Sequence, residues 1–203
     1  ALTGLLGIFT KEIVFTLPFV IFLLDVLFIQ EEGKSFKKSG TVFFIIMLSF
    51  AMIIPLMYKI FGDTLFCLRN PSESHAGDIV TPVNYLLTQF RVVPIYIRLL
   101  FFPLGLNLDY DFPVSSSLIE PITTLGGLIF LLFVIWLGFV LLKKNRLIAF
   151  GIFWFFITAS IESSFIPIRH VIFEHRTYLP SIGFFIAIVF ALSSVVRDFK
   201  KVA

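Results

Sequence analysis

Long apolar runs constrain this chain more than any other feature of its sequence. Each comes close to the roughly 17 to 25 residues with which an α-helix crosses about 30 Å of hydrocarbon. Across the chain 58% of the residues are hydrophobic, only 14% are charged, and the mean hydropathy is +1.01. So few charges cannot cover a water-soluble surface. The expected membrane spans are residues 13–29, 41–60, 122–142, 147–165 and 181–196.

The short segments between these runs predict an orientation. Three of them are rich in lysine and arginine, and the positive-inside rule assigns such segments to the cytoplasm. Five crossings then place residues 61–121 and 166–180 together on the outer face. We therefore expect an all-α, polytopic integral membrane protein of about five transmembrane helices. The basic segments are residues 30–40, 143–146 and 197–201.

The outer segment 61–121 contains a helix of a second kind, predicted at residues 83–103. Its polar residues recur at helical spacing and form one narrow stripe on an apolar cylinder. Because both flanks are expected on the outer face, this helix should lie in the membrane interface, or dip in and return. Pro94 predicts a kink midway. The stripe consists of Asn84, Thr88, Arg91 and Arg98.

Most of the charge outside the basic segments gathers at the predicted outer face. Charge at membrane depth is costly, and it usually faces a protein interior or a water-filled cavity. Each group also has an ordinary structural explanation. Lys11 and Glu12 form either an interfacial pair that caps a helix or part of a site. Arg91 and Arg98 either reach toward lipid phosphates or hold the phosphate of a bound ligand.

The remaining polar groups give weaker signals. Asp109 and Asp111 are either a solvated turn or a site for a metal or an acceptor, but two carboxylates alone indicate a metal only weakly. His170 and His175 lack the spacing of a zinc site, so no metal site is predicted. Glu162 has neighbouring serines with which it can bond. The net charge is +3, but most of the basic residues lie beside apolar runs, where they set the orientation in the membrane. No nucleic-acid partner is therefore expected.

Three successive segments of the chain carry a family resemblance. They are TKEIVFTLPFVIFLLDVLF (10–28), TQFRVVPIYIRLLFFPLGLNLDYDFPVS (88–115) and IFEHRTYLPSIGF (172–184). These resemble a Lys-Glu step opening a membrane helix, a long outer segment with an interfacial helix, and a Glu-x-x-x-Tyr-Leu-Pro-Ser step before the last membrane helix. In that order they are similar to the membrane domain of the transmembrane and tetratricopeptide-repeat proteins, GT-C-fold relatives of the protein O-mannosyltransferases.

The resemblance implies a membrane glycosyltransferase that takes a sugar from a polyprenyl-phosphate donor and transfers it to a protein hydroxyl, or to another acceptor such as a glycan, on the outer face. It also implies a catalytic acid in a first outer loop upstream of Ala1 and a tetratricopeptide-repeat region after the last helix. We therefore expect residues 1–203 to be the C-terminal half of such a membrane domain, in contact with the lipid of a bacterial inner membrane or of the endoplasmic reticulum membrane. No cofactor is expected besides the lipid-linked donor, and the need for a divalent metal stays open.

Glycosyl transfer from a lipid phosphate needs a base for the acceptor hydroxyl and positive charge beside the leaving phosphate. The candidate phosphate-binding residues are Arg91, Arg98 and Arg176, with Lys11 assisting. The supporting residues are Glu12, Glu174, Tyr178, Asp109 and Asp111. Glu12 and Glu174 are expected to orient the cations, since the base is expected upstream of Ala1.

Two other classes of protein fit the same composition. In a transporter or channel, the charges would line a solute path, usually with internal repeats and with charge near the bilayer midplane. The sequence shows no internal repeat, and its charges gather at one interface, which favours chemistry on a lipid headgroup. A non-catalytic membrane scaffold is the third possibility.

Overall fold

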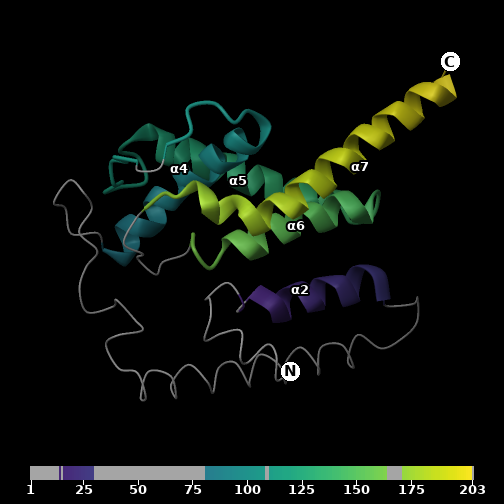
Figure 1. Ribbon diagram of the computed structural model, residues 1–203, viewed down its shortest axis with the longest axis horizontal. Coiled ribbons are helices and arrows are strands. Elements are labelled where there is room, and N and C mark those ends of the chain that lie inside the picture. Colours follow the sequence, from purple (N-terminus) through teal and green to yellow (C-terminus); the bar gives the residue numbers. More distant parts are fainter. Residues whose placement is uncertain (1–13, 15, 30–80, 108–109, 164–170, 203) are drawn as a thin grey trace.

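A computed structural model describes residues 14, 16–29, 81–107, 110–163 and 171–202 (Figure 1). The regular structure in these residues is entirely helical, which confirms the all-α prediction for this part of the chain. The expected run 41–60 lies outside the described residues. The elements are α2 (Leu17–Leu24), the π-helix η2 (Asp25–Ile29), α4 (Pro82–Phe101), α5 (Ile122–Leu141), α6 (Arg146–Ala159), the 3₁₀ helix η4 (Glu174–Thr177) and α7 (Tyr178–Val202).

Two helical stretches among the described residues are long and apolar enough to cross a membrane. They are α5, which nearly coincides with the predicted run 122–142, and Glu174–Arg197, which joins η4 to most of α7. Only 17% and 11% of their most apolar stretches are buried, whereas the core helix of a soluble protein is mostly enclosed. Large side chains such as Trp136 and Phe185 are more than half exposed. Apolar side chains exposed along a long helix are typical of contact with lipid.

Helix α6 is shorter than the predicted run 147–165. Its 14 residues rise about 21 Å, less than the thickness of the hydrocarbon core. The Asn145 side chain caps its start by accepting a hydrogen bond from the backbone N–H of Ile148 (3.4 Å). At its end, the Ser160 hydroxyl donates to the carbonyl oxygen of Ile157 (2.7 Å), a local bond that competes with a further helical turn.

Helices α6 and α7 pack against each other more extensively than any other described pair (Figure 1). Glycine makes their close approach possible. A Cβ atom at Gly151 would lie 2.4 Å from the carbonyl oxygen of Gly183, and one at Gly183 would lie 2.5 Å from that of Gly151. The Trp154 indole N–H also donates to the carbonyl oxygen of Leu179 (3.0 Å). Small residues at a crossing are typical of helices that associate in membranes.

Helix α4 packs along the first half of α5. A Cβ atom at Gly127 would lie 1.9 Å from the carbonyl oxygen of Phe90. That oxygen would normally accept from the residue four positions later, but Pro94 has no N–H to donate. Pro94 lies inside α4 without ending it, and the backbone of α5 takes the place beside the free carbonyl. Further along both helices, Val93 packs with Leu131, so α4 and α5 run in the same direction.

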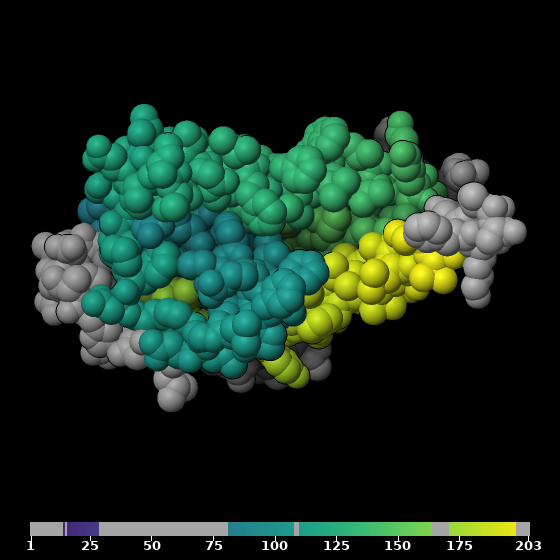
Figure 2. All heavy atoms as spheres, turned by 90° about the horizontal axis from the view of Figure 1, so that it is seen from above, coloured from purple at the N-terminus to yellow at the C-terminus, as the bar shows by residue number. Residues whose placement is uncertain are grey.

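The segment between α4 and α5 returns along α4 to the start of α5. Gly105, with φ of +73°, turns the chain just after α4. The backbone N–H of Ser115 then donates to the Thr88 hydroxyl (2.9 Å), and the hydroxyls of Ser115 and Thr124 are 3.0 Å apart. Figure 2 shows α4 and this segment, in teal, covering one end of the molecule, while α7 extends beyond them at the other end.

Candidate functional site

One end of the helical bundle holds a group of buried polar side chains, here called the polar cluster. Its members come from one face of α4, from the turn after α6 and from η4. Because residues three, four and seven apart share a helix face, α4 presents its members toward η4 together. The polar cluster consists of Tyr85, Gln89, Tyr96, Glu162 and Arg176.

Arg176 lies at the centre of the polar cluster. Its side chain is only 5% exposed, and its Nε atom lies 3.8 Å from Oε2 of Glu162. Its Nη1 donates to the Tyr85 hydroxyl (3.3 Å), which itself donates to the backbone carbonyl oxygen of Glu162 (2.8 Å). The guanidinium also lies over the Phe173 ring, 5.5 Å from its centre. A buried charge needs such partners, so Arg176 fixes the turn before α7 against α4.

Two further members of the polar cluster hold the chain before η4. Gln89 donates from Nε2 to the carbonyl oxygen of Val171 (3.0 Å), and the Tyr96 hydroxyl accepts from the backbone N–H of Phe173 (2.9 Å). The Gln89 Oε1 atom is buried and accepts no hydrogen bond from a described residue. The cavity beside Arg176 and Glu162 has a volume of about 10 Å³. That is the space of one water molecule, so a sugar phosphate does not fit there.

Glu174 forms a second contact, on the more exposed side of η4. Its Oε1 atom accepts from the backbone N–H of Asn107 (2.7 Å) and from the Tyr110 hydroxyl. The carboxylate thereby joins the start of η4 to the segment after α4. These two described partners of Glu174 are an amide and a phenol, and its role in orienting cations stays a prediction.

The contact between Tyr110 and Glu174 predicts a dependence of stability on pH. Partial burial, followed by the hydrogen bond and the negative charge of Glu174, raises the pKa of Tyr110 above its ordinary value of 10.0. The unfolded chain therefore loses this proton at a lower pH than the folded protein. The contribution of protonated Tyr110 to the free energy of unfolding is therefore complete below pH 10.0. It is lost as the pH rises through the pKa of Tyr110 in the folded protein. Tyr110→Phe should remove this dependence and lower the free energy of unfolding by about 1 kcal/mol near neutral pH.

Thermal unfolding in detergent from neutral to strongly alkaline pH measures this effect. Tyr178→Phe is the matched control, because the side chain of Tyr178 is 79% exposed. Equal slopes of stability against pH for the Tyr110→Phe variant and the unsubstituted protein would show that the Glu174 contact does not form.

Arg91 lies on another face of α4, away from the polar cluster. Its Nη1 donates to the carbonyl oxygen of Pro113 (3.0 Å) and to the Ser115 hydroxyl (3.2 Å), and its guanidinium lies 4.6 Å from the centre of the Phe112 ring. These contacts tie the returning segment to α4. Both hydrogen bonds use Nη1, and Nη2 and Nε form none with the described residues.

Arg91 also lines an open pocket of about 460 Å³ between α4 and α5, here called the α4–α5 pocket. Most of its wall is apolar, and Arg91 is the charged residue in it. Residues 91, 94 and 95 line it, and Arg98 continues the same helix face one turn further on. Arg98 is exposed to solvent in the described structure. The pocket is lined by Arg91, Pro94, Ile95, Phe112, Thr123, Gly126, Gly127 and Phe130.

The structure thus separates the predicted site residues. Arg91 and Arg98 share a face of α4, whereas Arg176 is enclosed in the polar cluster. Asp111 and Tyr178 are exposed and belong to neither group. Lys11, Glu12 and Asp109 lie outside the described residues. Among the residues that are described, no three His, Cys, Asp or Glu side chains come close enough together to hold a metal ion.

The sequence reasoning missed Tyr85, Gln89, Tyr96 and Tyr110, and treated Glu162 as a residue bonded to neighbouring serines. A signal for the first three was present, because positions 85, 89 and 96 recur at helical spacing on α4. Thr88, predicted to share one polar stripe with Arg91 and Arg98, is fully buried beneath Ser115, whereas Arg98 is exposed. No protein-family model, no curated protein and no solved structure matches the chain.

Proposed function

We propose that this chain is part of a multi-pass membrane glycosyltransferase that uses a polyprenyl-phosphate sugar and transfers the sugar to a protein hydroxyl or a glycan acceptor on the outer face. The observation that carries the proposal is the α4–α5 pocket. It combines one fixed arginine with apolar walls. An isoprenoid phosphate has the complementary chemistry, a compact anion joined to a long hydrocarbon chain.

The assignments within this proposal follow from burial. Arg91 binds the donor phosphate through Nη2 and Nε, which bond to no described residue, and Arg98 adds a second positive charge on the same face. Negative charge grows on the leaving phosphate during transfer, so fixed cations beside it stabilise the transition state. Arg176 is a positioning residue, because it is enclosed and paired with Glu162. The base that accepts the proton of the acceptor hydroxyl is proposed to lie upstream of Ala1.

The proposed topology has about five crossings, with the basic segments in the cytoplasm. The Asn145 side chain donates to the Ser194 hydroxyl (3.0 Å), which supports this arrangement because it brings residues 143–146 and the end of α7 together. Tyr85 and Glu162 mark the opposite end. From there α4 runs beside the first half of α5 and its following segment returns, as expected for a helix that dips into the outer leaflet.

Arg98 gives the sharpest test of the phosphate assignment, because its exposed side chain leaves the fold little dependent on it. Arg98→Gln in the full-length protein should raise KM for the polyprenyl-phosphate donor about tenfold, as expected when one charge-assisted hydrogen bond is lost. The unfolding temperature should stay the same. Lys143→Gln removes a similar charge at the other end of the bundle and should leave KM unchanged. An unchanged KM in Arg98→Gln would remove Arg98 from the donor site.

A non-catalytic scaffold is the second candidate, and the polar cluster favours it. Arg176 forms an ion pair with Glu162 and a hydrogen bond with Tyr85, and both contacts stabilise the fold. Proteoliposomes of the full-length protein, supplied with a polyprenyl-phospho-sugar, distinguish the classes. Donor-dependent transfer or hydrolysis supports the enzyme, passage of a solute supports a transporter, and neither activity supports the scaffold.

A further inference from the structure

A second pocket lies at the other end of the bundle, where η2, the start of α6 and the end of α7 meet. Its volume is about 580 Å³, and nine residues line it. Three of these carry positive charge and none carries negative charge. The lining residues are Phe28, Lys144, Asn145, Arg146, Leu147, Phe190, Ser193, Ser194 and Arg197.

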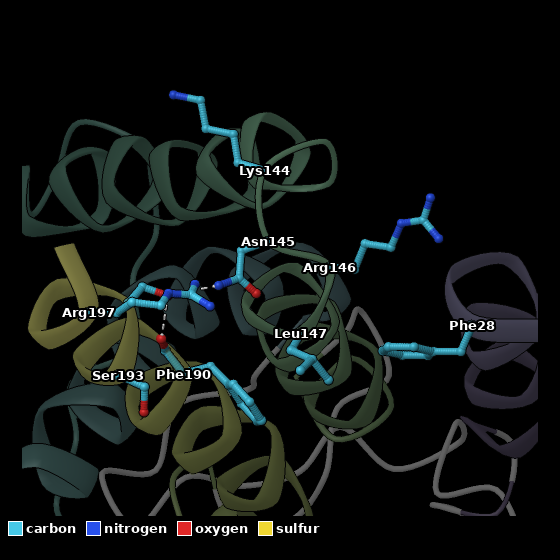
Figure 3. Close-up of a pocket in the computed structure, with 9 residues that line it drawn as sticks. Phe28, Lys144, Asn145, Arg146, Leu147, Phe190, Ser193 and Arg197 are labelled. Carbon is cyan, nitrogen blue, oxygen red and sulfur yellow. Dashed lines mark hydrogen bonds between the residues drawn. The ribbon is translucent and has the colours of Figure 1, made fainter. Parts of the chain in front are cut away.

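The lining of this basic pocket is divided by chemistry. In Figure 3, Lys144, Asn145 and Arg146 lie on one side, and the apolar side chains of Leu147 and Phe190 lie on the other. Arg197 reaches from α7 toward Asn145, whose side chain donates to the Ser194 hydroxyl (3.0 Å). The Arg197 guanidinium and the Asn145 amide therefore lie together above an apolar floor, whereas the Lys144 and Arg146 side chains extend away from it toward the rim.

The cations of the pocket differ in what they already bind. Arg146 donates from Nη1 to the carbonyl oxygen of Leu27 (3.4 Å), which ties α6 to η2. Lys144 and Arg197 are exposed, and neither forms an ion pair with a described side chain. Two exposed cations thus lie at the rim of the pocket, close to the apolar side chains of Leu147 and Phe190.

We propose that this basic pocket binds the headgroup of an anionic phospholipid. The phosphate binds the Arg197 guanidinium beside Asn145, Lys144 adds positive charge at the rim, and one acyl chain runs over Leu147 and Phe190. Basic pockets between membrane helices on the cytoplasmic side suit such headgroups, since each Lys or Arg near the surface adds to the attraction. The apolar floor selects a lipid over a free phosphate. This binding is independent of the proposed glycosyl transfer, which occurs at the opposite end.

The test uses the full-length protein in detergent with phosphatidylglycerol or phosphatidylcholine, and native mass spectrometry counts the retained lipid. Phosphatidylglycerol should bind more tightly than phosphatidylcholine. Lys144→Gln and Arg197→Gln should each weaken its binding about fivefold, and the double variant about 20-fold. Lys143→Gln is the matched control, because Lys143 is exposed in the same segment but does not line the pocket. It should change binding less than twofold, on the order of measurement error.

Three results would overturn the proposal. Equal retention of both lipids would show that the basic pocket does not distinguish an anionic headgroup from a zwitterionic one. An equal effect of Lys143→Gln and Lys144→Gln would reduce the site to general surface charge. Displacement of the lipid by inorganic phosphate alone would show that the pocket binds a free anion. Unfolding temperatures equal to that of the unsubstituted protein confirm that the variants are folded, and donor turnover should be the same in all of them.

Discussion

Arg176→Gln is expected to lower the free energy of unfolding by about 3–5 kcal/mol, the largest effect of any single charge removal in the described part of the chain. The reason is the environment of Glu162. Its side chain is 9% exposed, and Arg176 is the cation beside it. Removing the guanidinium leaves a buried carboxylate without its charge partner and leaves the Tyr85 hydroxyl without one of its donors. Unfolding by denaturant in detergent micelles measures the change.

A double-mutant cycle separates the ion pair from the rest of the network. Glu162→Gln combined with Arg176→Gln removes both buried charges, so the double variant should be less destabilised than the sum of the two single variants. Arg98→Gln is the control, because it removes an exposed charge from α4. If Arg176→Gln destabilises the protein no more than Arg98→Gln does, the polar cluster does not hold the turn before α7.

Gly127→Ala is expected to destabilise the protein by about 3 kcal/mol, near the upper end for overpacking. The added methyl group would meet the carbonyl oxygen of Phe90 at 1.9 Å, and that atom belongs to the backbone of α4. A flexible side chain could move away, but a helix backbone can yield only by separating α4 from α5. The returning segment and Arg91 would shift with it, so donor turnover should also fall.

Gly126 provides the control, because alanine at this position is expected to raise the free energy of unfolding. A Cβ atom at Gly126 would meet nothing within 4 Å. Gly126→Ala should therefore stabilise the helix by about 0.5–1 kcal/mol, since alanine loses less backbone entropy on folding. Equal effects of the two substitutions on the unfolding midpoint would contradict the close contact between α4 and α5.

The helices were predictable because hydrophobicity and helix signals agree along the sequence. The run 122–142 contains no charge, and α5 covers Ile122–Leu141. The predicted helix 83–103 appears as α4, beginning at Pro82, because Thr81 accepts a hydrogen bond from the Asn84 N–H and Pro82 fits the first turn. The end of α6 was not predictable, because it depends on Ser160 and on the attraction of Glu162 to a residue 14 positions later.

The sequence predicted several of the charged residues at this end of the molecule, but not that they divide between the polar cluster and the α4–α5 pocket. The gathering of charge near α4 and η4 follows from the topology that the sequence predicts. The burial of Arg176 does not, because it depends on Tyr85, 91 residues earlier in the chain. In the same way, a stripe of polar residues on α4 cannot reveal that Thr88 and Arg91 bind the returning segment while Arg98 stays exposed.

The most direct test of the central claim is to map where a photoreactive polyprenyl-phosphate analogue attaches to the full-length protein in proteoliposomes. Attachment is predicted in α4 near Arg91 and Arg98 and in the facing part of α5 near Thr123 and Phe130, the walls of the α4–α5 pocket. An unreactive polyprenyl phosphate should suppress it, and Arg98→Gln should reduce it. Attachment spread along the lipid-facing sides of α5 and α7, and unaffected by the competitor, would contradict a donor site in this pocket.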